Sequence, residues 1–208
     1  MENHIVTPPP LIEWAVAARP LHGQGESGDL HLVEPFPNGV LVAVVDGLGH
    51  GHEAAIAARI AVATLESYAG EDVVSLVRRC HERLKGTRGV VMTLVRVSAH
   101  DRTITWLGVG DVEGLLLRAD AWASPAREYV LLRGGVVGEA LPPLRASVLP
   151  VSQSDTLVLA TDGISHGFAE RLNLSDPPQR IADRILTTHG KPTDDSLVLV
   201  VRYLGPVQ

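Results

Sequence analysis

The chain has 208 residues, of which 45% are hydrophobic and 20% charged, a composition typical of a globular domain with a buried core. Its net charge of −6 argues against a nucleic-acid binder, which needs a basic surface to neutralise phosphates. No apolar run approaches the ~20 residues that span a bilayer, and no N-terminal segment resembles a secretory signal. Cys80 is the only cysteine, so we expect no internal disulfide and a reducing, cytoplasmic location.

The first half of the chain predicts strands followed by helices. Residues 1–10 end in three prolines and are expected to form a loose arm of a single domain. Strands are expected over residues 13–19, 30–33 and 40–45, the last buried on both faces because it is continuously apolar. A turn is expected over 35–39. Alanine-rich spacing predicts a helix over 53–68, and Asp72 is expected to cap a second helix through Leu84 with Cys80 in its core-facing stripe.

The second half changes to strand periodicity. Strands are expected over residues 90–98, 103–109, 114–118, 129–133, 146–149, 156–160 and 197–203. A short helix is expected over 164–174, and Pro177-Pro178 is expected to start a longer helix that reaches residue 188. The expected strands cluster in antiparallel hairpins, and pairs of helices occur at two places in the chain. This pattern indicates an α+β fold, in which two sheets pack face to face with the helices outside.

Three aspartates adjoin strongly apolar strands. Asp46 follows residues 40–45, Asp162 follows 156–160, and Asp194 precedes 197–203. A carboxylate at the rim of a buried strand loses hydration and needs hydrogen bonds or cations in return. Each aspartate alone could cap a turn, as Asp-Gly often does. Three together favour a site for hard cations, and carboxylate oxygens suit Mg²⁺ or Mn²⁺ better than zinc.

Other chemistries match the sequence less well. His50, His52 and Glu53 could bind zinc, but they lack the His-Glu-x-x-His spacing of a helical zinc site. The glycine turn after Asp46 does not match the dinucleotide pattern Gly-x-Gly-x-x-Gly. Ser165 has the spacing of Gly-x-Ser-x-Gly but lacks the strand, elbow and ordered Asp and His of a hydrolase triad.

The segments VVDGLGHG, LATDGI and DDSLVLV together resemble the metal-site motifs of the PPM-type metal-dependent Ser/Thr protein phosphatases, and best match their bacterial SpoIIE/RsbX-like branch. The segments TRGVV, GVGDVEG and GGVVG add to this resemblance, which extends from about residue 12 to residue 203. It implies a four-layer α-β-β-α sandwich that carries two Mn²⁺ (or Mg²⁺) ions at one end.

The resemblance also implies a role for each acid. Asp46 would bridge both metals, and the Gly47 carbonyl would bind one of them. Asp162 and Asp194 would complete the first metal site. Asp29 would serve the second, with Glu26 as the alternative. A hydroxide that bridges the metals would attack the phosphorus of phosphoserine or phosphothreonine in line.

The chain departs from the family pattern at the proton donor. Leu48 stands where many eukaryotic members carry a histidine, which leaves His50 as the candidate general acid. Arg88 and Arg19 are candidates for holding the phosphate, although the sequence favours a surface or structural role for each.

The resemblance implies that the substrate is a phosphorylated STAS-domain protein of a bacterial stress-signalling complex, either a stressosome or a related partner-switching module. Two alternatives remain open at this point. The chain could be a catalytically silent binding module with the same fold, or a metal-dependent hydrolase of small phosphate esters. A deep closed pocket would favour the small-ester hydrolase, and a shallow open site would favour a protein substrate.

Overall fold

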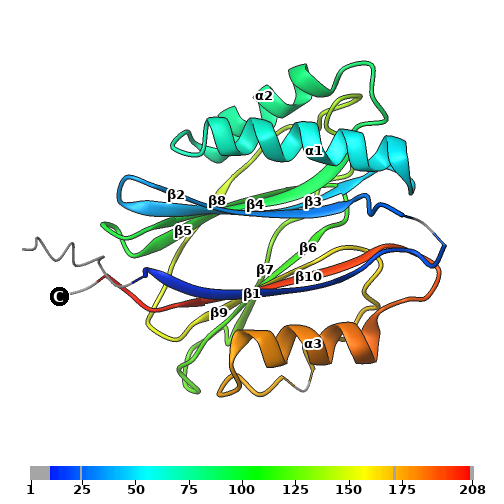
Figure 1. Ribbon diagram of the computed structural model, residues 1–208. Coiled ribbons are helices and arrows are strands. Elements are labelled where there is room, and N and C mark those ends of the chain that lie inside the picture. Colours follow the sequence, from blue (N-terminus) through cyan, green and yellow to red (C-terminus); the bar gives the residue numbers. More distant parts are fainter. Residues whose placement is uncertain (1–9, 24, 171, 207–208) are drawn as a thin grey trace, which may run out of the picture.

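The computed structural model describes residues 10–23, 25–170 and 172–206, which form two antiparallel sheets packed face to face (Figure 1). One sheet has the order β1 (Ile12–Arg19), β10 (Ser196–Tyr203), β9 (Thr156–Ala160), β6 (Glu113–Leu117) and β7 (Arg127–Tyr129). The other has the order β2 (Asp29–Phe36), β3 (Gly39–Gly47), β4 (Val90–Ser98), β5 (Thr103–Val109) and β8 (Ser147–Pro150). Apart from Pro10, the predicted loose arm lies outside the described residues.

Helices cover the outer face of each sheet, as Figure 1 shows. α1 (His52–Ser67) and α2 (Val73–Leu84) pack on the sheet that contains β3, and α3 (Pro178–His189) packs on β1 and β10. Asp72 caps α2 as predicted, because its side chain accepts hydrogen bonds from the backbone N–H groups of Val74 and Ser75, each over 3.0 Å. The predicted α-β-β-α sandwich is confirmed. In the part of the chain that the structure describes, no helix combines the length and apolar character needed to cross a bilayer.

Strand β3 is the central element, because both of its faces are buried. Val42 and Val44 point into the layer between the two sheets, whereas Ala43 and Val45 point toward α1 and α2. All four side chains have 0% exposure, which explains why the run is continuously apolar rather than alternating. Cys80 lies in the same helix-facing layer, and burial raises the pKa of its thiol to about 12, so it is a core residue as predicted.

Two local predictions are wrong, and a third extends too far. The expected turn over 35–39 is shorter, because β2 and β3 stay paired up to Phe36 and Gly39 and Asn38 turns the chain with a φ of 65°. The expected strand over 129–133 ends at Tyr129, because the Arg133 carbonyl accepts a hydrogen bond from Gly110 in the β5–β6 turn. The described residues of 164–174 contain no helix, since Gly167 adopts a left-handed φ of 84° there.

Candidate metal centre

Four strand ends bring the predicted aspartates to one end of the sandwich. Asp29 is the first residue of β2 and Asp46 the last but one of β3, and the antiparallel register makes them direct partners. In the other sheet, Asp162 follows β9 and Asp194 precedes β10, and these two strands also pair antiparallel. The Thr161 hydroxyl donates a hydrogen bond to Asp29 Oδ2 over 2.7 Å, which joins the two pairs across the sandwich.

Asp29 and Asp46 are both withdrawn from water. Asp29 is 4% exposed, and Asp46 is partly buried. Burial raises the pKa of Asp46 to about 9, and the charges of Asp29 and Asp162 act in the same direction. Burial likewise raises the pKa of Asp29 to about 7, although the hydrogen bond from Thr161 opposes that shift. Without a cation, the two carboxylates therefore resist being charged together.

Asp162 and Asp194 lie nearer to the surface. Asp162 is exposed and Asp194 is partly buried. Burial still raises the pKa of both carboxyls, and the charge of Asp162 raises that of Asp194 further. Lys191 acts in the opposite direction on both, and its ammonium donates a hydrogen bond to the Asp162 carbonyl oxygen over 2.5 Å. This side of the site is therefore open to solvent and carries a compensating positive charge.

Asp111 belongs to the same end of the sandwich but is absent from the predicted set. It lies in the turn after β5, and its charge raises the pKa of both Asp46 and Asp162. The signal that identifies the other acids also applies here, because Asp111 follows a strongly apolar strand at residues 103–109. An acid that follows an apolar strand is therefore the pattern that identifies Asp111 as well.

Asp195 is a second acid that the sequence did not single out. Its side chain is 3% exposed, and its two oxygens accept backbone hydrogen bonds from Leu21 and Gly28, each over 2.7 Å. The available signal was its position next to Asp194 before an apolar strand. The sequence does not say which of two adjacent acids points inward.

The glycines after Asp46 make room for a close approach between β3 and α1. A Cβ at Gly47 would lie 2.2 Å from the carbonyl oxygen of Ala54, so a larger residue cannot fit there. A Cβ at Gly28 would lie 3.2 Å from the Gly47 carbonyl oxygen, so a side chain at this position would crowd that oxygen. Gly49 and Gly51 adopt left-handed φ values of 84° and 77° as the chain turns into α1.

Glu26 lies apart from the acids described above. Its carboxylate contacts His52 Nδ1 at 3.1 Å and Arg59 at 3.4 Å on the surface. The hydrogen bond with His52 is the main reason why the pKa of Glu26 is lowered. Asp29, rather than Glu26, is the acid that faces Asp46 in the β2–β3 pair.

The candidate proton donor and phosphate-holding residues lie at the rim. His50 is exposed within the glycine turn. Arg88 forms an ion pair with Glu53 at 2.6 Å and lies against the same turn. Arg19 donates a hydrogen bond to the Lys191 carbonyl oxygen over 3.1 Å.

The donor set fits a hard cation that keeps part of its water shell. Within the described residues, no three His, Cys, Asp or Glu side chains are arranged to hold a metal ion by themselves. Mg²⁺ typically takes one or two carboxylates and retains several waters, so a preformed cage is not required. A bound cation would offset the burial and the neighbouring negative charges that raise the pKa values of Asp29 and Asp46, and the Gly47 carbonyl could add a neutral oxygen donor.

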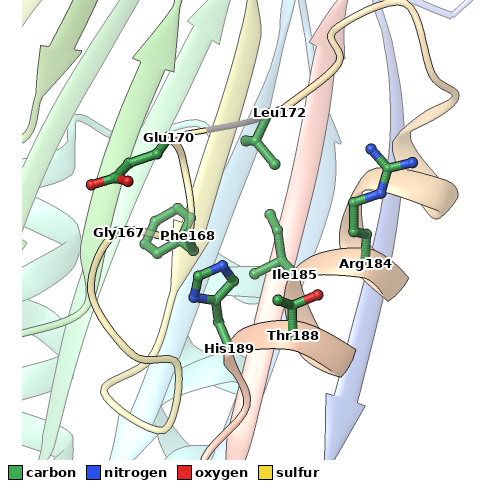
Figure 2. Close-up of a pocket in the computed structure, with 8 residues that line it drawn as sticks. All are labelled: Gly167, Phe168, Glu170, Leu172, Arg184, Ile185, Thr188 and His189. Carbon is green, nitrogen blue, oxygen red and sulfur yellow. The ribbon is translucent and has the colours of Figure 1, made fainter.

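Two pockets differ in their relation to these acids. A pocket of about 320 Å³ lies between α3 and the loop around Phe168, and its lining in Figure 2 contains none of the predicted metal residues. Another pocket, of about 390 Å³, is lined by Asp194 together with Arg19 and residues 20–23. The second pocket therefore adjoins the acids, and the first belongs to the helical layer.

Comparisons with known proteins agree with this architecture. The family model "Stage II sporulation protein E (SpoIIE)" matches residues 37–204. "Phosphoserine phosphatase RsbX" of Bacillus subtilis (strain 168) is 27% identical over 149 residues, which are 70% of this chain and 72% of that protein.

Solved structures resemble nearly the whole chain. One, described as "The bacterial stressosome: a modular system that has been adapted to control secondary messenger signaling", is 31% identical, covers 92% of this chain and 99% of its own, and has a TM-score of 0.84. RsbX in complex with magnesium is 21% identical, covers 92% of this chain and 95% of its own, and has a TM-score of 0.78. At that identity, the likeness to RsbX shows a shared fold.

Proposed function

Because the chain belongs to the SpoIIE family, we propose that it is a metal-dependent protein-serine/threonine phosphatase that uses two Mn²⁺ or Mg²⁺ ions. The observation that carries the proposal is the meeting of Asp29, Asp46, Asp162 and Asp194, from four strand ends, at one end of the sandwich. All four carboxyls have raised pKa values, which is the electrostatic state that divalent cations relieve. The similarity to the phosphoserine phosphatase RsbX supports the same enzyme class.

The proposed ligand set follows the strand ends. Asp46 would bridge both ions, and the Gly47 carbonyl would bind one of them. Asp162 and Asp194 would hold the first ion, and Asp29 the second. Two cations of this kind activate water as a nucleophile and neutralise charge on a phosphoryl group.

The chain's own residues at the rim would orient the substrate. Lys191 places a positive charge beside Asp162 and Asp194, which offsets the repulsion between this acidic end and an incoming phosphate dianion. His50 is the proposed proton donor to the leaving hydroxyl, because it lies exposed in the turn after Asp46. Arg88, in the same region, is a candidate contact for the phosphate if it leaves Glu53.

The exposure of the outer acids favours a protein substrate over a small ester. Asp162 and Asp111 are exposed, so a phosphorylated side chain on a folded partner can reach this end of the sandwich. We infer that the substrate is a phosphorylated STAS-domain protein of a stress-signalling complex. The similar chain described in connection with the bacterial stressosome supports this choice.

The proposal is tested by incubating the purified protein with phosphoserine- and phosphothreonine-bearing STAS proteins, with Mn²⁺ and with excess chelator. We expect the wild type to release phosphate only with the metal. The Asp46→Asn variant should release phosphate from the same phosphoproteins far more slowly. Equal release in chelator would contradict the metal-dependent activity. Release from an aryl phosphate but from no STAS protein would contradict only the substrate.

A further inference from the structure

The buried carboxylate of Asp195 joins segments that are distant in sequence. It lies directly before β10, and its side chain is 3% exposed. One oxygen accepts a hydrogen bond from the Leu21 N–H and the other from the Gly28 N–H, both over 2.7 Å. The single carboxylate therefore holds both ends of the segment between β1 and β2.

Gly28 carries this connection onward to β3. Its carbonyl accepts a hydrogen bond from the Gly47 N–H over 3.0 Å. Gly28 also packs tightly, because a Cβ there would lie 3.0 Å from the Ala54 Cβ. The path from Asp195 through Gly28 to Gly47 is thus made of two hydrogen bonds, and a side chain at Gly28 would crowd Ala54.

Each residue on this path adjoins a proposed carboxylate ligand, and the Gly47 carbonyl is itself a proposed ligand. Asp195 follows Asp194, Gly28 precedes Asp29, and Gly47 follows Asp46. A shift in any one segment would therefore change the separation of carboxylates that come from different sheets. A carboxylate suits this task better than an amide, because both of its oxygens accept hydrogen bonds and an Asn side chain offers one acceptor only.

We propose that Asp195 is a positioning residue that sets the spacing of the three ligand-bearing segments and so determines how tightly the site binds a divalent cation. This inference rests on the proposed metal-dependent function. Asp195 acts through Gly28 and Gly47 rather than by contact with the cation. Residues that orient metal ligands in this way typically change metal affinity by about 10- to 100-fold when they are replaced.

Asp155 offers a matched control within the same chain. It is 2% exposed and also accepts backbone hydrogen bonds, from Ala119 over 2.9 Å and Ser152 over 3.0 Å, and in addition it pairs with Arg118 at 2.9 Å. It stands before β9, at the opposite end of that strand from Asp162. Asp155→Asn therefore removes a buried structural carboxylate without touching the path to the metal site.

The experiment is calorimetric titration of Mn²⁺ into the full chain and into the Asp195→Asn, Gly28→Ala and Asp155→Asn variants, with thermal unfolding recorded for each. We expect roughly 10- to 100-fold weaker Mn²⁺ binding for Asp195→Asn, weaker binding for Gly28→Ala, and wild-type affinity for Asp155→Asn. Phosphatase turnover of Asp195→Asn should recover toward the wild-type value at saturating Mn²⁺, because the proposed ligands are intact.

The possible results distinguish the positioning role of Asp195 from the proposed metal-dependent function. A wild type that does not bind Mn²⁺ overturns both. A wild type that binds Mn²⁺, with Asp195→Asn matching it within twofold, overturns the positioning role alone. If Asp195→Asn does not fold, Gly28→Ala decides, and wild-type affinity in that variant rejects the proposed path. A comparable loss of affinity in Asp155→Asn would also reject it, since the effect would then be one of general stability.

Discussion

Asp29 and Asp46 are register partners on the neighbouring antiparallel strands β2 and β3. Like charges directly opposite each other in a sheet are destabilising, and both of these carboxyls are also largely withdrawn from water. The pairing persists because the surrounding sheet is held by apolar packing on both sides of β3. The fold thus holds together two carboxylates that repel each other unless a proton or a cation lies between them.

The metal-free protein should lose stability as the pH rises. The folded-state pKa values of Asp29 and Asp46, about 7 and about 9, lie above the usual value of 3.8. Between pH 4 and pH 9 the folded state therefore binds more protons than the unfolded state, so the free energy of unfolding falls across this range. Thermal unfolding in excess chelator should show a Tm that decreases from pH 5 to pH 8.5.

The same series contains its own controls. Asp46→Asn should flatten the pH dependence, because an amide neither titrates nor repels Asp29. Added Mn²⁺ should raise the Tm most at high pH, where the carboxylates are charged. A chelated wild type whose Tm rises steadily from pH 5 to pH 8.5 would show that the raised pKa values of these two acids do not govern its stability.

Replacing Lys191 should change metal binding and substrate binding in opposite directions. Its ammonium lowers the pKa of Asp162 and Asp194, so Lys191→Ala makes the site more negative. An exposed charge of this kind is worth about 0.2–1 kcal/mol, so we expect Mn²⁺ to bind up to roughly fivefold more tightly and KM for a phosphoprotein to rise by a similar factor.

Lys85→Ala is the matched control for this change, because Lys85 is an exposed lysine that pairs with Glu82 at the end of α2. It should leave both constants unchanged. Weaker Mn²⁺ binding in Lys191→Ala would mean that the residue supports the site through its hydrogen bond to the Asp162 carbonyl rather than through its charge.

Gly163→Ala should destabilise the fold strongly. A Cβ at this position would lie 1.8 Å from the Asp195 carbonyl oxygen, so the backbone before β10 would have to move. Overpacking of this kind typically costs about 1–3 kcal/mol or more. Gly70→Ala is the comparison, because its Cβ would meet nothing within 4 Å. Urea unfolding of the two variants should therefore show a lower midpoint for Gly163→Ala alone.

Much of the fold could be predicted from the sequence, because the responsible patterns are local. The apolar run at 40–45, the Asp72 cap and the prolines at the start of α3 each indicated an element that the structure contains. The apolar stretch at 129–133 resembles a strand, but its pairing with β6 stops at Tyr129, and the Arg133 carbonyl accepts a hydrogen bond from Gly110 in the β5–β6 turn. Local pattern does not show where a partner strand ends.

The acids of the site could be predicted from the sequence only where they adjoin an apolar strand. Asp46, Asp162 and Asp194 stood out because each adjoins an apolar strand, and Asp111 fits the same criterion. The role of Asp195 depends on its hydrogen bonds with Leu21 and Gly28, which lie 174 and 167 positions away in the sequence. Such contacts follow from the packing of the two sheets, which is a property of the tertiary structure.

The central claim is that Asp46 organises a metal site that hydrolyses phosphate esters. It is tested most directly by measuring aryl phosphate hydrolysis by the wild type, by Asp46→Asn and by Asp101→Asn, an exposed aspartate in the β4–β5 turn, with Mn²⁺ and with excess chelator. We predict Mn²⁺-dependent turnover in the wild type and Asp101→Asn, and turnover in Asp46→Asn no higher than in the chelated wild type. Turnover that persists in chelator, or that survives the loss of the Asp46 carboxylate, would contradict the claim.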